Sequence, residues 1–72
     1  MVMVSEGEKN MSKELGQQLR TLRGKANLTQ AVVAAKAGIS VNYYARIERG
    51  EENPTWVKIE HIKKALGVKS LS

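Results

Sequence analysis

Residues 28–50, LTQAVVAAKAGISVNYYARIERG, decide the fold, because they carry the signals for two short helices joined by a tight turn. Thr29 and Ser40 each stand just before a run with helical spacing, where a side-chain hydroxyl accepts an unpaired backbone N–H of the first turn. Gly38 lies between the two runs and supplies the backbone freedom that a sharp turn needs. The pattern predicts helices over residues 30–37 and 41–49.

The chain before this stretch contains one amphipathic segment. Leu15, Leu19 and Leu22 recur at helical intervals, which places them on one face of a helix beginning at Ser12. Residues 1–11 show no such period, so we expect a flexible N-terminal arm there. The domain itself is expected over residues 12–69.

The chain after the stretch contains the last predicted helix. Pro54 stops any helical run before it, and Thr55 provides its N-cap. The apolar spacing predicts one buried face, and Gly67 ends the helix. No strand pattern occurs, so the predicted fold class is all-α. The side chains expected in the core from this helix are Trp56, Ile59, Ile62 and Leu66.

The composition limits what so small a chain can do. Its 72 residues make one domain with a marginal core and no room for an enzyme cleft beside a scaffold. It has no cysteine and a single histidine, His61, so we expect no metal, no cofactor and no enzymatic activity. The net charge of +5 suggests an acidic partner. Beyond residue 11 the chain keeps eleven basic and five acidic residues, so the predicted domain carries the positive charge.

Apolar runs are short throughout the sequence. None approaches the roughly 18 residues that a membrane-spanning helix needs, and no signal-peptide pattern occurs. We therefore expect no membrane partner and a cytoplasmic location.

The helix predicted over residues 41–49 has two chemically different faces. At about 100° per residue, its two tyrosines lie on one side, while Val41, Asn42 and Arg46 share the other. Asparagine can form a bidentate pair with adenine and arginine with guanine, and valine can pack on a thymine methyl group. This outward face, which also holds Ala45 and Arg49, therefore suits the reading of base edges in the major groove of DNA. The alternative is that these are ordinary surface residues of an amphipathic helix.

The order of the motifs resembles the lambda-repressor/Cro-type family of helix–turn–helix DNA-binding domains, also called the XRE family. The resemblance covers about three-quarters of the chain, residues 15–68. It implies four to five helices and a sequence-specific transcriptional regulator of double-stranded DNA, either a repressor or a controller protein, associated with the nucleoid. The matching residues are Leu19, Leu22, Arg23, Leu28 to Gln30, Ala34, Lys36 to Ser40, Arg46 to Gly50, Asn53 to Thr55 and Ala65 to Val68.

The resemblance places Val41, Asn42 and Arg46 at the positions that contact base edges, and it also implies a set of DNA phosphate contacts. Gln30 resembles the family glutamine that contacts a phosphate and braces the recognition helix. Ser40 and Tyr43 occupy positions nearer the DNA backbone, although Tyr43 can equally be a packing residue. Asn53 and Thr55 resemble the loop that grips a phosphate on the far side.

Three further residues concern the scaffold of the predicted domain. Arg23 and Glu48 match a family ion pair between the first and third helices. Tyr44 stands where the family prefers Ile or Leu, so we expect it in the core with its hydroxyl at the rim. The alternative is that Tyr44 pushes the third helix outward.

Two features depart from the family pattern. Glu51 and Glu52 place negative charge in the loop expected near a phosphate, so they must point away from DNA or weaken binding there. Many relatives continue beyond the position of Val68 into a fifth helix that helps form a dimer. The chain therefore pairs through a different surface, belongs to a longer protein or acts as a weak monomer. Of these, we expect a homodimer on DNA, because tight recognition normally needs two half-sites about 34 Å apart.

A second function class stays open from the sequence. The chain can be an antitoxin or adaptor whose main role is to bind a protein partner, with residues 1–11 folding on that partner. An affinity that falls steeply with added salt favours DNA, whereas insensitive binding favours a protein partner.

Overall fold

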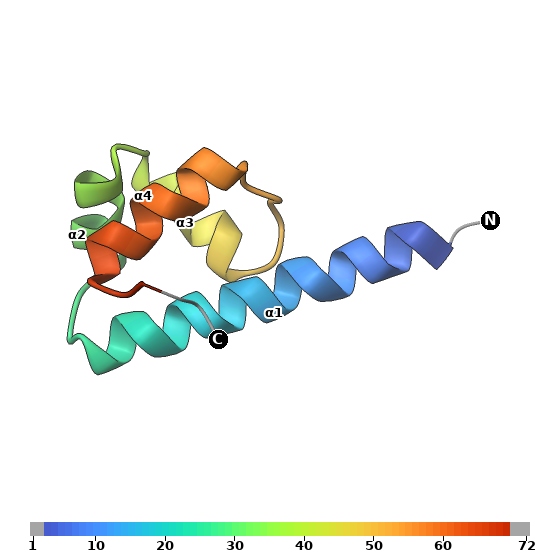
Figure 1. Ribbon diagram of the computed structural model, residues 1–72, viewed down its shortest axis with the longest axis horizontal. Helices are drawn as coiled ribbons and strands as arrows, with labels where there is room; N and C mark the ends of the chain where they lie inside the picture. Colours follow the sequence, from blue (N-terminus) through green and yellow to red (C-terminus); the bar gives the residue numbers. More distant parts are fainter. Residues whose placement is uncertain (1–2, 70–72) are drawn as a thin grey trace.

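Four α-helices make up the part of the chain that the computed structural model describes, residues 3–69, with side chains from residue 12 onward. In Figure 1 the three short helices lie together on one side of the long first helix, whose N-terminal turns project beyond them. The prediction of an all-α fold is confirmed. In chain order the helices are α1 (Met3–Lys25), α2 (Gln30–Ala37), α3 (Val41–Glu48) and α4 (Trp56–Leu66).

Hydroxyl caps set the starts of the three short helices. The side chain of Thr29 accepts the N–H of Val32 at 3.1 Å, and Ser40 accepts the N–H of Tyr43 at 3.0 Å. Thr55 accepts from the first turn of α4 in the same way. Each cap satisfies one backbone donor that the helix leaves unpaired. The predicted bounds of these helices therefore follow from local chemistry.

The turn between α2 and α3 depends on a left-handed residue. Gly38 has φ 74°, a region that side chains with a Cβ rarely adopt. Its N–H and that of Ile39 bond back to carbonyls of α2, which ends that helix within one residue. The chain can then begin α3 in a new direction.

The start of α1 differs from the prediction. The helix begins at Met3 rather than at Ser12, so residues 3–11 are helical and not an irregular arm. The physical reason is that this segment contains no proline, and a lone glycine, Gly7, costs a helix only about 1 kcal/mol. The division into an arm over residues 1–11 and a domain over residues 12–69 stays a prediction. Residues 1–2 of that arm lie outside the described residues, as do residues 70–72, where a fifth helix would continue.

All four helices contribute to one apolar core. Helix α2 packs against α3 and α4, and α1 packs against α3. Tyr44, Ile47 and Ile62 are completely buried, and Leu19 is the deepest side chain of α1. The remaining core residues are Val33, Ala34, Ala37, Ala65 and Leu66.

Two of the core residues predicted for α4 lie outside this core: Ile59 is only half-buried, and Trp56 is mostly exposed. Trp56 is 71% exposed, so its assignment to the buried face of α4 is wrong. At about 100° per residue, Trp56 lies about 120° around the helix from the buried Ile62, whereas Leu66 lies within about 40° of it. The Lys63 ammonium group sits 5.9 Å from the centroid of the Trp56 ring and covers part of it.

The crossing of α1 and α3 is unusually close. A Cβ atom on Gly16 would lie 2.4 Å from the carbonyl oxygen of Glu48 and 2.6 Å from that of Ile47. Only a glycine at this position lets the backbone of α1 approach the end of α3. The contact sets the distance between α1 and α3 where the two helices cross.

Candidate nucleic-acid interface

Helix α3 divides into a buried face and a free face. Tyr44 and Ile47 have no exposed area and Glu48 is buried, whereas Val41 is 47% exposed. Asn42 is exposed beside Val41, in the first turn after the Ser40 cap. The division predicted from the helical period is confirmed.

The three predicted base-contacting residues share the free face of α3. Val41 and Asn42 offer a methyl surface and an amide that both donates and accepts. Arg46 lies about one turn further on and is partly exposed. Its Nη2 donates to Oε2 of Glu52 at 2.5 Å, so its guanidinium is held by the loop after α3.

A buried carboxylate joins α3 to the two helices before it. Arg23 of α1 donates to Glu48 twice, from Nε to Oε2 at 2.7 Å and from Nη2 to Oε1 at 3.1 Å. Gln30 at the start of α2 donates to Oε1 of the same carboxylate at 2.9 Å. The remaining Arg23 nitrogen, Nη1, donates to the carbonyl of Leu28, which ties the entry of α2 to the same group. The ion pair that the resemblance implied is present.

The environment of this carboxylate keeps it charged. Burial alone would raise the pKa of Glu48, since its side chain is only 3% exposed. The neighbouring donor groups of Arg23, Tyr44 and Gln30, with Arg23 the strongest, outweigh burial and hold the pKa of Glu48 below its ordinary value of 4.5. The same hydrogen bonding raises the pKa of Arg23. The pair is thus ionised on both sides and orients α3 on its scaffold.

The predicted phosphate-contacting residues lie at helix starts and in the loop after α3. Ser40 and Thr55 are exposed N-caps, and Asn53 is exposed in the loop between α3 and α4. Tyr43 is half-buried, and the Lys58 ammonium lies 5.6 Å from its ring centroid. This contact brings the first turns of α3 and α4 together.

The hydroxyl of Tyr44 departs from the prediction. The side chain belongs to the core as expected, but its hydroxyl does not reach the rim. It is buried and has no hydrogen-bond partner among the described residues. Burial and the nearby Glu48 carboxylate raise the pKa of Tyr44 above its ordinary value of 10.0.

The sequence reasoning missed two ion pairs between α3 and the loop that follows it. Besides the pair formed by Arg46 and Glu52, Arg49 donates to both oxygens of Glu51 at 3.0 and 3.1 Å. The acidic residues were expected to point away from DNA or to weaken binding. Their partners are Arg46 of α3 and Arg49 at its C-cap, and no helical spacing rule predicts contacts across the chain reversal at Gly50.

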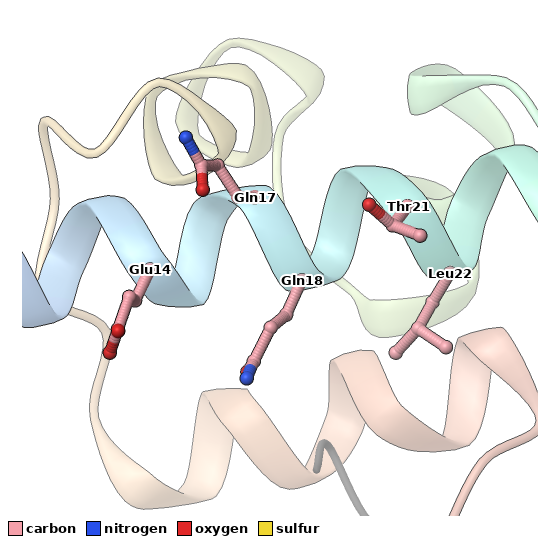
Figure 2. Close-up of a pocket in the computed structure, with 5 residues that line it drawn as sticks. All are labelled: Glu14, Gln17, Gln18, Thr21 and Leu22. Atoms are coloured by element: carbon pink, nitrogen blue, oxygen red, sulfur yellow. The ribbon is translucent and has the colours of Figure 1, made fainter.

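A groove lies beside α1. It has a volume of about 390 Å³. Figure 2 shows Glu14, Gln18 and Leu22 extending toward α4, while Gln17 points to the opposite side of α1. Its lining is mostly neutral amide and hydroxyl groups, with Glu14 as the one acidic residue. This lining offers no paired acid and base for catalysis.

Two further searches concern metals and membranes. No cluster of three or more candidate metal ligands occurs among residues that the structure describes. None of the helices within residues 3–69 is long and apolar enough to cross a bilayer.

Residues 14–71 match the family model of a helix-turn-helix domain. The chain is 39% identical over 59 residues to an HTH-type transcriptional regulator of Sinorhizobium fredii, covering 82% of this chain and 77% of that protein. It is 41% identical over 54 residues to control protein C.BamHI of Bacillus amyloliquefaciens, covering 74% and 67%. An immunity repressor of Bacillus phage phi105 is 39% identical over 54 residues, which is 75% of this chain and 38% of the repressor.

A solved structure has the same fold. The crystal structure of the restriction-modification controller protein C.AhdI from Aeromonas hydrophila superposes with a TM-score of 0.81 at 32% sequence identity. The superposition covers 83% of this chain and 91% of that one.

Proposed function

Because the chain belongs to the lambda-repressor/Cro-type helix-turn-helix family of transcriptional regulators, we propose that it reads double-stranded DNA with the free face of α3 in the major groove. It acts as a repressor or controller protein by occupying a promoter site. The observation that carries the proposal is the rigid mounting of α3, whose buried Glu48 is bonded to both Arg23 and Gln30. A recognition helix must be held in one orientation to compare base edges.

Base readout is assigned to three side chains of α3. Asn42 pairs with adenine through its amide, and Arg46 pairs with guanine through two of its N–H groups. Val41 packs on a thymine methyl group. Each bidentate pair discriminates against a wrong base by about 1–3 kcal/mol. These contacts carry the sequence information of the complex.

Phosphate contacts are assigned to the residues around α3. The amide of Gln30 has two hydrogens, of which Glu48 takes one, so the other is available for a phosphate oxygen. Ser40 uses its oxygen to cap α3 and keeps its hydroxyl hydrogen for a second phosphate. Tyr43, Asn53 and Thr55 complete the set. Such contacts fix the register of the protein on DNA.

Two copies are proposed to bind one operator in the cytoplasm, at the nucleoid. A single small domain makes few phosphate contacts, so a homodimer on an inverted repeat gains affinity that one copy lacks. No residue is assigned a catalytic role or a cofactor in this proposal.

The test is a selection of random double-stranded DNA by the purified chain at about 100 mM salt. The expected result is an enriched inverted repeat whose half-site centres lie about 10 base pairs apart, one helical turn. An enriched single half-site would contradict the dimer, and the absence of any enriched sequence would contradict sequence-specific readout.

A protein partner is the second candidate, because two adjacent apolar side chains at the start of α4 are exposed. Trp56 is 71% exposed and Val57 is 59% exposed. Exposed apolar neighbours of this kind favour protein contacts. If the chain is mainly an adaptor or antitoxin, its partner affinity will be insensitive to salt and will fall in a Trp56→Ala variant, while its DNA affinity stays weak.

A further inference from the structure

Two arginines at the C-terminal end of α3, Arg46 within the helix and Arg49 at its C-cap, are both neutralised within the chain. Arg46 pairs with Glu52 and Arg49 pairs with Glu51, so each cation that α3 could present to DNA already has a carboxylate. The carboxylates follow directly after α3, where the chain turns back at Gly50. The positive charge of the molecule is therefore concentrated elsewhere, although α3 is the predicted reading element.

The pair formed by Arg46 and Glu52 is the more constrained of the two. Its side chains are 41% and 30% exposed, against 54% and 53% for Arg49 and Glu51. The Nε atom of Arg46 is buried and has no hydrogen-bond partner among the described residues, and Nη2 is bonded to Glu52. The buried Nε is therefore closed to a DNA ligand, and one hydrogen of Nη2 is committed to Glu52. The donors that remain are the two hydrogens of Nη1 and one hydrogen of Nη2.

A guanine and a phosphate differ in how they can bind the remaining N–H donors of Arg46. Guanine offers two neutral acceptors, O6 and N7, which can take two N–H groups while the carboxylate stays in place. A phosphate carries a full negative charge and would approach Arg46 beside the charge of Glu52, which repels it. Contacts to phosphate bind all sequences alike, whereas contacts to guanine do not.

We propose that Glu52 is a specificity-determining residue. Its bond to Arg46 leaves this arginine able to donate hydrogen bonds to a guanine but repels a phosphate from it. The proposal rests on the proposed function, in which Arg46 reads a base. Glu52 acts as a repulsive element against non-specific DNA, the means by which many interfaces gain specificity. The charge of Glu52 also lowers the affinity of the protein for every DNA sequence.

The experiment compares Glu52→Gln with two controls that make the same charge change. Glu51→Gln alters the same loop but releases Arg49, which is not assigned to a base. Glu14→Gln alters an exposed carboxylate on α1, away from α3. Each variant and the wild type are titrated with a mixed-sequence duplex and with the duplex chosen by the random selection, at several salt concentrations. Thermal unfolding confirms that each variant is folded.

The expected result is a gain on the mixed-sequence duplex. Glu52→Gln raises that affinity about three- to tenfold and steepens the slope of log K against log salt by about 0.9, because one more phosphate is neutralised. Its affinity for the selected duplex changes less, so the ratio of the two affinities falls. Both controls leave this ratio close to that of the wild type.

The inference is overturned if the ratio falls no further for Glu52→Gln than for the controls, or if the salt slope on the mixed-sequence duplex does not change. Failure of the proposed function is visible separately, in a wild type that prefers no duplex. In that case the salt slope still decides whether Glu52 withholds Arg46 from phosphate.

Discussion

At the scale of single residues, the Glu48 carboxylate joins three parts of the fold. It receives hydrogen bonds from Arg23 of α1 and from Gln30 of α2, and it belongs to α3. Removing Arg23 would leave the carboxylate buried without its cation, a change that typically costs about 3–5 kcal/mol. The orientation of α3 therefore depends on one charged group being satisfied.

We predict a specific pH dependence from this group. The pKa of Glu48 is lower in the folded chain than its ordinary value of 4.5, so the stability it adds is present above that value and is lost as the pH falls through the folded pKa. The free energy of unfolding, measured by denaturant titration, should fall as the pH drops below 4.5 in the wild type. Glu48→Gln should give a flatter profile over that range. Parallel profiles for the two proteins would show that Glu48 is not held in its charged form.

The buried hydroxyl of Tyr44 gives a second prediction. Since it has no hydrogen-bond partner among the described residues, only its proximity to the Glu48 carboxylate offsets the cost of burying it. Tyr44→Phe should raise the free energy of unfolding by about 1 kcal/mol. Tyr43→Phe is the matched control, because Tyr43 is half-buried, and it should change little. A loss of stability in Tyr44→Phe would mean that this hydroxyl makes a hydrogen bond in solution.

At the scale of elements, the crossing of α1 and α3 depends on Gly16, and two glycines of α1 allow a matched test. Nothing lies within 4 Å of a Cβ placed on Gly24, whereas one on Gly16 meets the backbone of α3. Gly24→Ala should raise the free energy of unfolding by about 0.5–1 kcal/mol through helix propensity. Gly16→Ala should lower it by about 1–3 kcal/mol or more, because neither backbone can yield cheaply. Similar effects of both substitutions in thermal or denaturant unfolding would contradict the close crossing.

Local signals explain what the sequence could predict at this scale. The hydroxyl caps Thr29, Ser40 and Thr55 fix the starts of α2, α3 and α4, because each acts on the backbone within three residues. The start of α1 was missed because the N-terminal segment carries no stop signal. Trp56 was wrongly assigned to the core because the apolar spacing of α4 was followed back to its first residue, which lies outside the arc of the helix that faces the core.

Contacts between elements explain what the sequence could not predict. The close approach at Gly16 and the pair formed by Arg46 and Glu52 join segments whose relative positions depend on the packed fold. The pair of Arg23 and Glu48 was found only through the resemblance to a family, since 25 residues separate its partners. The hydrogen bond from Gln30 to Glu48 is seen only in the structure.

At the scale of the whole molecule, the core and the hydrogen bonds of the Glu48 carboxylate hold α3 in one orientation, with one face free. Helices α1 and α2 pack against the buried side of α3, and the free side carries Val41, Asn42 and Arg46. The acidic loop sets how strongly that face attracts anions. Specificity and general affinity for DNA are thus assigned to different groups in one small domain.

The most direct test of base readout by α3 is a selection of random double-stranded DNA by Arg46→Ala beside the wild type. The variant should enrich the same site with the preference relaxed at one base position in each half-site. Its affinity for the wild-type site should fall by about 1–3 kcal/mol, the discrimination of one bidentate pair. An unchanged site preference with affinity lowered equally for every sequence would contradict the assignment and make Arg46 a phosphate contact.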